Sequence, residues 1–558
     1  MGPLIIVLLV DAVGWAIIFS VFPRSAQDFP LGDDWVYAYG ATEFAHGHGA
    51  NYLHWAGMPQ LGQWLWAYPF IAWFGTNLVG LRMSTILLGL FGLAAFYDLA
   101  RQAGAGPKEA AVVTATLALN PFFVLLQGSF MTDIPALSFG FLALAFYGRA
   151  LAGNGRVFWI AGGLLAILAG CTRQNMIAVA PAVGLLYWRC PPRQRLLAAF
   201  AIIVPILVGL GTHFWFERRP DVQHPLMIRP SLDRAFLIAF IIVHASGLAS
   251  APLMALDPRP RSLWRFTLAA LAMGASAYYW WRRSDQLVFG GWFPYATGLI
   301  GYSGPYAGLM AGSMEAWLPI WLRGALTIGG CLGGGCLIDR ALARLPGGLA
   351  NPVVLFALLQ FPLLLITSGV NDRYMFMTLP GLLILAMPLQ CRLSAFGGVL
   401  PISVAGSPRP REGERGGGQG TFERSENHDA FVRFAPALVA LGIMAIISFG
   451  LMHDCLTWNS ARWALGKRAV ARGIESWRIE GGMEWNGWNY LHDPPPVFQQ
   501  PPKNNLLLGF TRKCFPGVTG ELALAFVPLP GLDVLEHEDY QTWLPPRRQT
   551  FYLIAPKH

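Results

Sequence analysis

Long charge-free apolar runs follow one another through the first 453 residues, with short polar connections between them. A bilayer core needs roughly 20 apolar residues per helix, and the backbone groups must pair within the helix. The pattern therefore predicts an α-helical polytopic membrane protein with about thirteen transmembrane helices. We place these at residues 3–22, 82–100, 109–128, 134–150, 157–172, 175–189, 196–216, 235–255, 265–281, 317–337, 350–367, 374–390 and 434–452.

Composition supports the same class of protein. Of the 558 residues, 54% are hydrophobic and 13% are charged, and the mean hydropathy is +0.45. Soluble domains carry about a quarter charged residues, so a cytosolic enzyme, a disordered protein and a secreted disulfide scaffold are excluded. The net charge is +9, but the basic residues interrupt apolar runs instead of clustering on a soluble face. We therefore expect a lipid bilayer and no nucleic acid as partner.

The distribution of lysine and arginine sets the expected orientation. With a cytoplasmic N-terminus and a retained first helix, the cytoplasmic connections are the more basic ones, as the positive-inside rule requires. The protein is then expected in the plasma membrane, which for a bacterium is the inner membrane. The long first loop, residues 23–81, is extracytoplasmic in this arrangement, and its aromatic second half is expected to form interfacial helices.

Two domains are predicted. Residues 1–452 form the transmembrane domain, with a Gly- and Pro-rich flexible cytoplasmic insertion at 405–428. Residues 453–558 regain soluble composition and are expected to form a small extracytoplasmic α/β domain. It begins with a helix over Ser460–Glu475 and continues with strands near Leu506–Phe510, Leu522–Val527 and Thr550–Ile554. Cys455 and Cys514 either form a disulfide there or remain two thiols.

Acidic residues mark the first outer loop. Asp33 and Asp34 stand side by side in a Gly-Asp-Asp-Trp-Val-Tyr run that includes Tyr37. Paired carboxylates beside aromatic rings suit a general base or a metal site, and their alternative is a solvated acidic loop. Asp133 interrupts two apolar helices at another outer turn, where it is either part of the same site or a helix cap.

Basic residues mark further outer turns. Arg173 and Arg373 each lie between two predicted spans. Facing the carboxylates, their guanidinium groups would suit a ligand with a phosphate, which arginine binds in a bidentate fork. The alternative is that both snorkel to lipid headgroups. Asp11, inside the first span, is costly enough there to suggest a function, but no partner for it is evident.

At this point the motifs resemble those of a known superfamily. The Asp33-Asp34 pair with Tyr37 is similar to the Asp-Glu-x-x-Tyr motif of GT-C membrane glycosyltransferases. The branch it looks like is the protein-mannosyltransferase type, glycosyltransferase family 39, with the bacterial lipid A aminoarabinose transferases. The run Met58–Leu65 resembles the family's Lys-Pro-Pro-Leu-x-x-Trp-Leu. Further landmarks, in family order within residues 1–390, are Phe74-Gly75, Leu81–Ser84, Met131–Pro135, Cys171–Arg173 and Asp372–Tyr374.

The resemblance implies a reaction. Asp33 would be the base that activates an acceptor hydroxyl for in-line attack on the anomeric carbon of a polyprenyl-phosphate sugar, with inversion. Asp34 and Asp133 would complete the catalytic group, and Arg173 and Arg373 would hold the donor phosphate. The acceptor would be a lipid, a glycan or a protein on the outer face of the membrane.

Further substrate contacts follow from the same resemblance. Tyr37 and Tyr374 would line the donor site. The family's lysine is Met58 here, so either His54 or Arg82 would supply the missing phosphate contact, or the donor differs. A divalent cation between the acidic loops stays open as a cofactor.

Two other classes of function compete with an enzyme. A multi-pass transporter or flippase of lipid-linked substrates would show internal repeats and spans broken by Gly or Pro. No clear repeat is present, and apart from Asp11 the charges lie in connections. A scaffold for envelope assembly would leave the acidic pair without a role.

Overall fold

The computed structural model describes residues 2–22, 28–222, 229–282, 300–301, 304–305, 311–312, 317–366, 373, 376–388, 419–495 and 514–557. Most of these residues are helical. The α-helices are α1 (Gly2–Val21), α2 (Asp34–Ala45), α3 (Leu61–Phe74), α4 (Leu78–Gln102), α5 (Pro107–Ala118), α6 (Pro121–Gln127), α7 (Asp133–Leu151), α8 (Arg156–Thr172), α9 (Val179–Gly184), α10 (Arg195–Glu217), α11 (Leu232–Ala249), α12 (Ala251–Leu256), α13 (Leu263–Arg282), α14 (Ile320–Gly348), α15 (Pro352–Ile366), α17 (Leu379–Ala386), α18 (Gln419–Ala471) and α19 (Met483–His492). Short 3₁₀ helices are η2 (Gln174–Ala178), η3 (Tyr187–Arg189), η4 (Pro192–Gln194), η5 (Phe376–Thr378) and η6 (Ser476–Arg478).

Among the described helices, seven are long and apolar enough to cross a membrane: α1, α4, α7, α10 with η4, α11, α14 and the part of α18 from Phe434. α5 and α6, bent by 63° against each other, make an eighth candidate, and α8, α15 and η5–α17 are shorter apolar helices. The helical polytopic fold class is thus confirmed, but the count of thirteen spans is not. Residues 175–189 divide into η2, α9 and η3, and α13 is not apolar enough to qualify.

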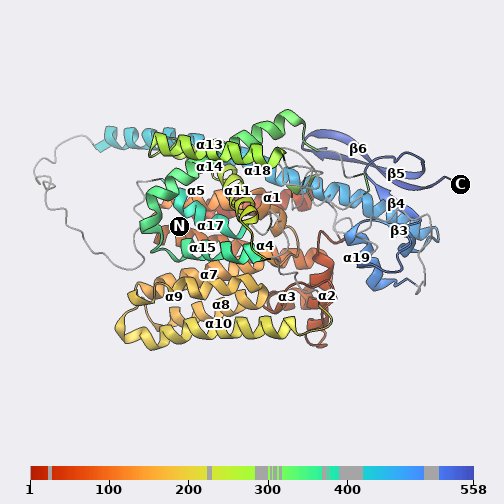
Figure 1. The fold of residues 1–558 in the computed structure, drawn as a ribbon, viewed down its shortest axis with the longest axis horizontal. Helices are drawn as coiled ribbons and strands as arrows, with labels where there is room; N and C mark the ends of the chain where they lie inside the picture. The colour runs from red at the N-terminus through yellow and green to blue at the C-terminus, as the bar shows by residue number, and fades with distance from the viewer. Residues whose placement is uncertain are drawn as a thin grey trace, which may run out of the picture.

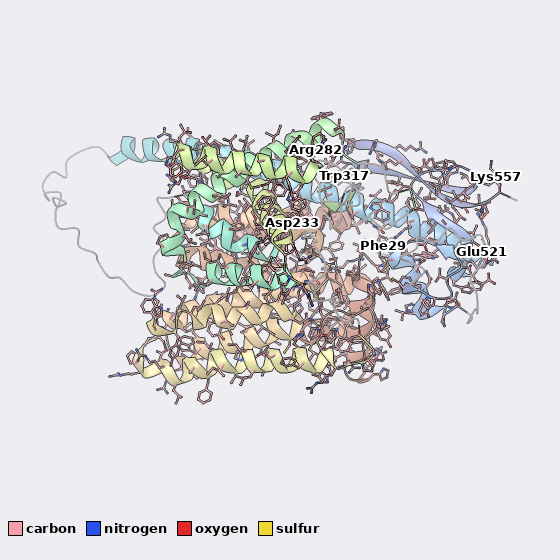
Figure 2. The ribbon with its side chains drawn as sticks, in the orientation of Figure 1. Phe29, Asp233, Arg282, Trp317, Glu521 and Lys557 are labelled. Carbon is pink, nitrogen blue, oxygen red and sulfur yellow. The ribbon has the colours of Figure 1, made fainter. Side chains whose placement is uncertain are left out.

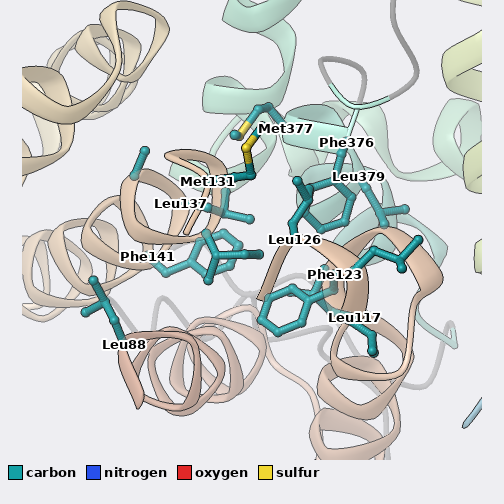
Figure 3. Packing of buried hydrophobic residues seen from close by; sticks show 14 of the residues in the cluster. Leu88, Leu117, Phe123, Leu126, Met131, Leu137, Phe141, Phe376, Met377 and Leu379 are labelled. Atoms are coloured by element: carbon teal, nitrogen blue, oxygen red, sulfur yellow. The ribbon is translucent and has the colours of Figure 1, made fainter. Parts of the chain in front are cut away.

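The main hydrophobic core extends through most of the described chain, and one part of it lies where α4, α5, α6, α7 and the η5–α17 segment meet (Figure 3). Phe123 of α6 packs edge-on against Phe376 of η5, with ring centroids 6.3 Å apart. The bend before α6 follows from its sequence, because Asn120 accepts the Phe122 amide at 2.9 Å and Pro121 begins the new helix. The bend therefore turns α6 into this core.

Asp11 has a partner that sequence reasoning did not find. Its Oδ2 accepts a hydrogen bond from Gln127 Nε2 at 3.0 Å, and Gln127 Oε1 accepts one from Trp15 Nε1 at 3.0 Å. All three side chains are buried. Because Asp11 and Trp15 belong to α1 and Gln127 to the end of α6, this group joins the first helix to the bundle.

The C-terminal region combines one long helix with a small sheet. α18 continues without a break from its apolar part to Ala471, so the predicted domain boundary at residue 453 falls inside a helix. Strands β3 (Ile479–Glu480), β4 (Leu522–Ala525), β5 (Leu532–Trp543) and β6 (Pro546–Pro556) form a sheet in the order β3-β4-β6-β5. β3 runs parallel to β4, and the other pairs are antiparallel. Two further short strands, β1 (Ile300–Gly301) and β2 (Gly304–Pro305), pair with each other.

The helix predicted from Ser460 is present as the end of α18, and the strands predicted at 522–527 and 550–554 are β4 and β6. Residues 506–510 lie outside the described residues, as do 405–418 of the predicted insertion, whose residues 419–428 belong to α18. β5 was not predicted from the sequence, because its acidic residues interrupt the alternation of apolar and polar positions that is typical of a strand.

The sheet is attached to α18 at the tip of the β5–β6 hairpin. Asp454 accepts the backbone amides of Trp543 at 2.6 Å and Leu544 at 2.8 Å, and the Trp543 ring stacks on His453 with centroids 3.8 Å apart. The neighbouring Cys455 is a fully buried free thiol, so the structure contains no Cys455–Cys514 disulfide. In Figure 1 the sheet lies at one end of the molecule, along the end of α18 and close to α19.

The contact between α3 and α8 gives a first prediction. A Cβ atom on Gly62 would meet the Leu168 carbonyl oxygen at 2.3 Å and Thr172 Oγ1 at 2.4 Å. Gly62→Ala is therefore expected to push the two helices apart and to lower the free energy of unfolding by about 1–3 kcal/mol. The thermal midpoint of the purified protein in detergent measures the effect. Gly211→Ala in α10, where a Cβ meets nothing within 4 Å, is the matched control; equal midpoints for the two variants would contradict the prediction.

Candidate functional site

The first loop is held to the bundle through a buried carboxylate at the start of α2. Asp34 Oδ2 accepts hydrogen bonds from Arg82 of α4, with Nη2 at 3.1 Å and Nε at 3.3 Å. Asp34 Oδ1 accepts the backbone amide of Phe130, in the α6–α7 connection, at 2.8 Å. The Asp34 side chain is fully buried, and this desolvation raises its pKa to about 6, although Arg82 opposes the shift. Asp34 therefore joins three separate segments.

Asp33, one residue earlier, lies in a different environment. It occupies the N-cap position of α2 without making a side-chain capping bond. Its Oδ2 instead lies 3.4 Å from Nη1 of Arg373, a residue more than 300 positions away in the chain. The Asp33 side chain is 30% exposed, whereas Asp34 and Asp133 are fully buried. Asp33 is thus the accessible carboxylate of the three.

The second outer turn contributes another buried ion pair. Asp133 begins α7, and its Oδ1 lies 2.6 Å from Nη1 of Arg173, the residue that follows α8. The same Nη1 donates to Thr132 Oγ1 at 3.3 Å. Asp133 is not a helix cap, since the start of α7 has no side-chain capping bond. With 5% of its surface exposed, Arg173 does not snorkel to headgroups either.

Tyr37, in the second turn of α2, lies within electrostatic range of both pairs. Burial raises the pKa of its phenol, and the Asp33 and Asp133 carboxylates act in the same direction, against Arg373 and Arg173. The phenol therefore stays protonated at neutral pH. The structure thus brings together five predicted site residues: Asp33, Arg373, Asp133, Arg173 and Tyr37.

The loop before α3 closes over the Asp133 side of the site. Met58 Sδ accepts a hydrogen bond from Thr132 Oγ1 at 3.1 Å, and the Gly57 carbonyl accepts one from Gln174 Nε2 at 3.0 Å. The backbone amide of Gln60 donates a hydrogen bond to the Thr172 carbonyl at 3.3 Å. Gln60 has a φ of 61°, which is the one left-handed value among the described non-glycine residues. Met58 thus contacts Thr132, the residue that precedes Asp133.

Three other residues are predicted to contact the substrate: Arg82, His54 and Tyr374. The Arg82 guanidinium donates hydrogen bonds to Asp34 and to the Phe29 carbonyl, and Arg82 is 2% exposed. It therefore joins α4 to the first loop. His54 is exposed, and among the described residues it makes no hydrogen bond or ion pair with the site. Tyr374 lies outside the described residues.

The described carboxylates do not form a metal site. Among the residues that the structure describes, no group of three or more His, Cys, Asp and Glu side chains is placed to hold a metal ion. Asp33, Asp34 and Asp133 each face an arginine, which opposes cation binding by charge. His48 pairs with Glu43 at 3.1 Å instead of joining a ligand set.

Sequence reasoning missed several groups that support the site. The Phe130 amide is a backbone donor, which a motif does not reveal. Gln63 donates to the Phe130 carbonyl at 3.1 Å, and Glu484 of α19 accepts the Gly32 amide at 3.2 Å. The available signal for Glu484 was its place as an acidic residue in the Gly- and Trp-rich run 481–488.

Comparison with known proteins gives a structural likeness. No family model matches the chain, and no curated protein matches it. Two solved structures of ArnT from Cupriavidus metallidurans are similar over 99% of both chains. One is bound to undecaprenyl phosphate, with a TM-score of 0.43 and 15% identity. The other is in the apo state, with a TM-score of 0.41 and 14% identity.

The raised pKa of Asp34 can be measured. On acidification through about pH 6 the carboxylate gains a proton, well above the 3.8 of an ordinary aspartate. The folded chain binds this proton more tightly than the unfolded chain does. Acidification through pH 6 therefore stabilises the folded state relative to the unfolded state, although the loss of the Asp34 charge weakens its pair with Arg82. We expect a protonated-carboxyl infrared band that grows near pH 6 and is missing from Asp34→Asn.

Two further variants test whether the infrared band belongs to Asp34. Arg82→Met removes a charge that lowers the pKa, so the midpoint moves to higher pH. Glu480, buried in the C-terminal region, has its pKa raised to about 7 by desolvation, and Glu480→Gln removes that separate component. A band difference between wild type and Asp34→Asn centred near pH 4 would contradict the prediction.

Proposed function

We propose that this protein is a membrane glycosyltransferase that moves a sugar from a polyprenyl-phosphate donor to a hydroxyl group of a lipid, glycan or protein. One observation carries the proposal. The Asp33–Arg373 and Asp133–Arg173 pairs, drawn from four distant parts of the chain, meet around the buried Tyr37 at the same end of the helices. A base and two cationic groups are what transfer from a phosphate leaving group needs.

Asp33 is the proposed base. It is the carboxylate with solvent access among the three, and its Oδ2 lies 3.4 Å from Nη1 of Arg373. The acceptor hydroxyl gives its proton to Asp33 as its oxygen attacks the anomeric carbon. The bond between that carbon and the phosphate oxygen breaks on the opposite face, so the configuration inverts. The leaving group is the polyprenyl phosphate anion.

Arg173 and Arg373 are the proposed phosphate ligands. Each guanidinium carries five N–H donors in a planar fork, so it can contact a phosphate while it stays near its aspartate. As the anomeric bond breaks, negative charge grows on the phosphate, and the two cations stabilise it. Asp133 holds Arg173, and Asp34 holds the turn that carries Asp33 through its pair with Arg82; both aspartates are buried and already paired.

The membrane gives the reaction its geometry. A polyprenyl tail can lie against the apolar helices while its phosphate sits at the helix ends. We place this end of the bundle, with the C-terminal region beside it, on the extracytoplasmic side of the plasma membrane, in keeping with the basic cytoplasmic connections. The transmembrane domain, 1–452, then carries the chemistry, and residues 453–558 lie over it.

A transporter or flippase of lipid-linked substrates is the competing function. The observation in its favour is the 63° break between α5 and α6, since broken helices are common in transporters. The Asp–Arg pairs are better explained by chemistry on a phosphate, because they lie at the helix ends and not at the midplane.

Asp33→Asn separates the two functions. The amide cannot take the proton, so sugar transfer is expected to fall by about 10²- to 10⁴-fold. Transfer from a radiolabelled polyprenyl-phosphate sugar in membranes measures it, and expression and membrane insertion should be unchanged. Glu43→Gln, which removes an acidic group of the same helix that pairs with His48, is the matched control. Near-normal turnover in Asp33→Asn would remove the base from the mechanism.

The two arginines are tested through binding. Arg173→Ala and Arg373→Ala each remove a charge-assisted contact and are expected to raise the Kd for a short-chain polyprenyl phosphate about tenfold or more. Arg149→Ala, at the other end of α7 where Arg149 pairs with Asp98, should leave binding unchanged. Wild-type affinity in both site variants would refute their role.

A further inference from the structure

The C-terminal region makes a direct contact with the turn that carries Asp33. Figure 1 shows α19 beside α2 at the end of the helical bundle. A Cβ atom on Gly487 of α19 would meet the Trp35 ring at 2.4 Å, so only glycine allows this approach. Phe515, from the segment before β4, packs on Trp35 and Trp55 with centroids 6.0 Å and 6.2 Å away. The two regions are therefore closely packed at this point.

Glu484 lies at the centre of this contact. Its Oε1 accepts the backbone amide of Gly32 at 3.2 Å, and its Oε2 accepts Nη1 of Arg462 at 3.0 Å. Gly32 has a φ of 59°, a left-handed conformation that suits glycine, and it directly precedes Asp33. One carboxylate thus connects α18 and α19 to the turn before α2.

The Glu484–Arg462 pair is shielded from water. Arg462 is fully buried and Glu484 is 7% exposed. Arg462 also donates to the Gly481 carbonyl at 3.1 Å and lies over the Trp458 and Trp463 rings, at 5.0 Å and 5.9 Å. Phe29 stacks on the same Trp463, with centroids 6.3 Å apart, at the junction of the helices and the C-terminal region (Figure 2). In a dry environment a hydrogen bond from an amide to a carboxylate is strong.

The turn is therefore held on both sides of Asp33. On one side, Asp34 is fixed by Arg82 and the Phe130 amide. On the other side, Gly32 is fixed by Glu484. The Asp33 side chain makes no capping bond to its own helix. The direction in which this side chain leaves the backbone therefore depends on the hydrogen bonds that fix Gly32 and Asp34.

We infer that Glu484 is a positioning residue for Asp33, acting through the Gly32 amide, and that Arg462 holds the Glu484 side chain in place. The inference rests on the proposed function, in which Asp33 is the base. It assigns to the C-terminal region a part in the chemistry of the helical region, since a base displaced by about 1 Å loses much of its effect.

A variant that removes only one charge of this pair leaves the other buried without compensation and can unfold the protein. The test therefore uses two double variants that are both neutral at this position. Arg462→Met with Glu484→Gln keeps an oxygen that can accept the Gly32 amide. Arg462→Met with Glu484→Met has nearly the same volume but lacks the acceptor. Glu521→Gln, which breaks the Arg478–Glu521 pair on the sheet side of the region (Glu521 in Figure 2), is the control.

Two readouts are needed. Hydrogen exchange of the peptide 28–37 reports the Gly32 bond whether or not the protein transfers sugar; exchange at Gly32 should be faster in the methionine variant than in the glutamine variant. In the transfer assay, kcat of the methionine variant should be about tenfold to a hundredfold below that of the glutamine variant. KM for the donor should stay within about twofold, since binding is not affected.

The outcomes are distinguishable. Equal exchange in the two double variants would overturn the contact, and faster exchange with equal kcat would overturn the positioning role. If wild-type protein transfers no sugar, the proposed function fails, while the exchange experiment still decides the contact. A loss of kcat in Glu521→Gln as large as in the methionine variant would show that any disturbance of the region suffices, which also overturns the inference.

Discussion

A fully buried carboxylate has to be compensated by donors that also lie in the interior, and Asp34 imposes this requirement on the site. Arg82 and the Phe130 amide meet it, one from α4 and one from the connection between α6 and α7. Satisfying one side chain therefore fixes the relative positions of three segments. Removing any one partner would leave a buried polar group without compensation, so the arrangement is strongly specified.

Neighbouring aspartates acquire different properties from this arrangement. Burial raises the pKa of Asp34 to about 6 and places it among fixed partners. Asp33, one residue away, points out of the helix end, remains partly exposed and faces Arg373. Environments that differ this much over one residue allow one carboxylate to hold structure while the other is available for proton transfer.

The helical region and the C-terminal region are joined by one continuous helix and by side-chain contacts. α18 runs from an apolar, membrane-length part into the C-terminal region without a break, and it carries both Asp454, which holds the β5–β6 hairpin, and Arg462, which holds Glu484. A single rigid helix thus transmits the position of the membrane part to the sheet and to the turn before α2. Glu484 of the C-terminal region, held by Arg462, thus contacts the turn that leads into the site.

The sequence by itself determined the helical membrane class, because apolar runs of span length have few other stable structures. It also identified Asp33, Asp133, Arg173 and Arg373 as candidates, because they mark the outer turns between the apolar runs, where oppositely charged side chains can meet at one face of the membrane. Tertiary structure alone decided the pairing. Arg82, expected at the donor phosphate, bonds Asp34; Asp11 is matched by Gln127; and Glu484 reaches a turn 452 positions away. Such pairs depend on which helix faces come together in space, and local hydrophobic patterns contain no information about partners so distant in the chain.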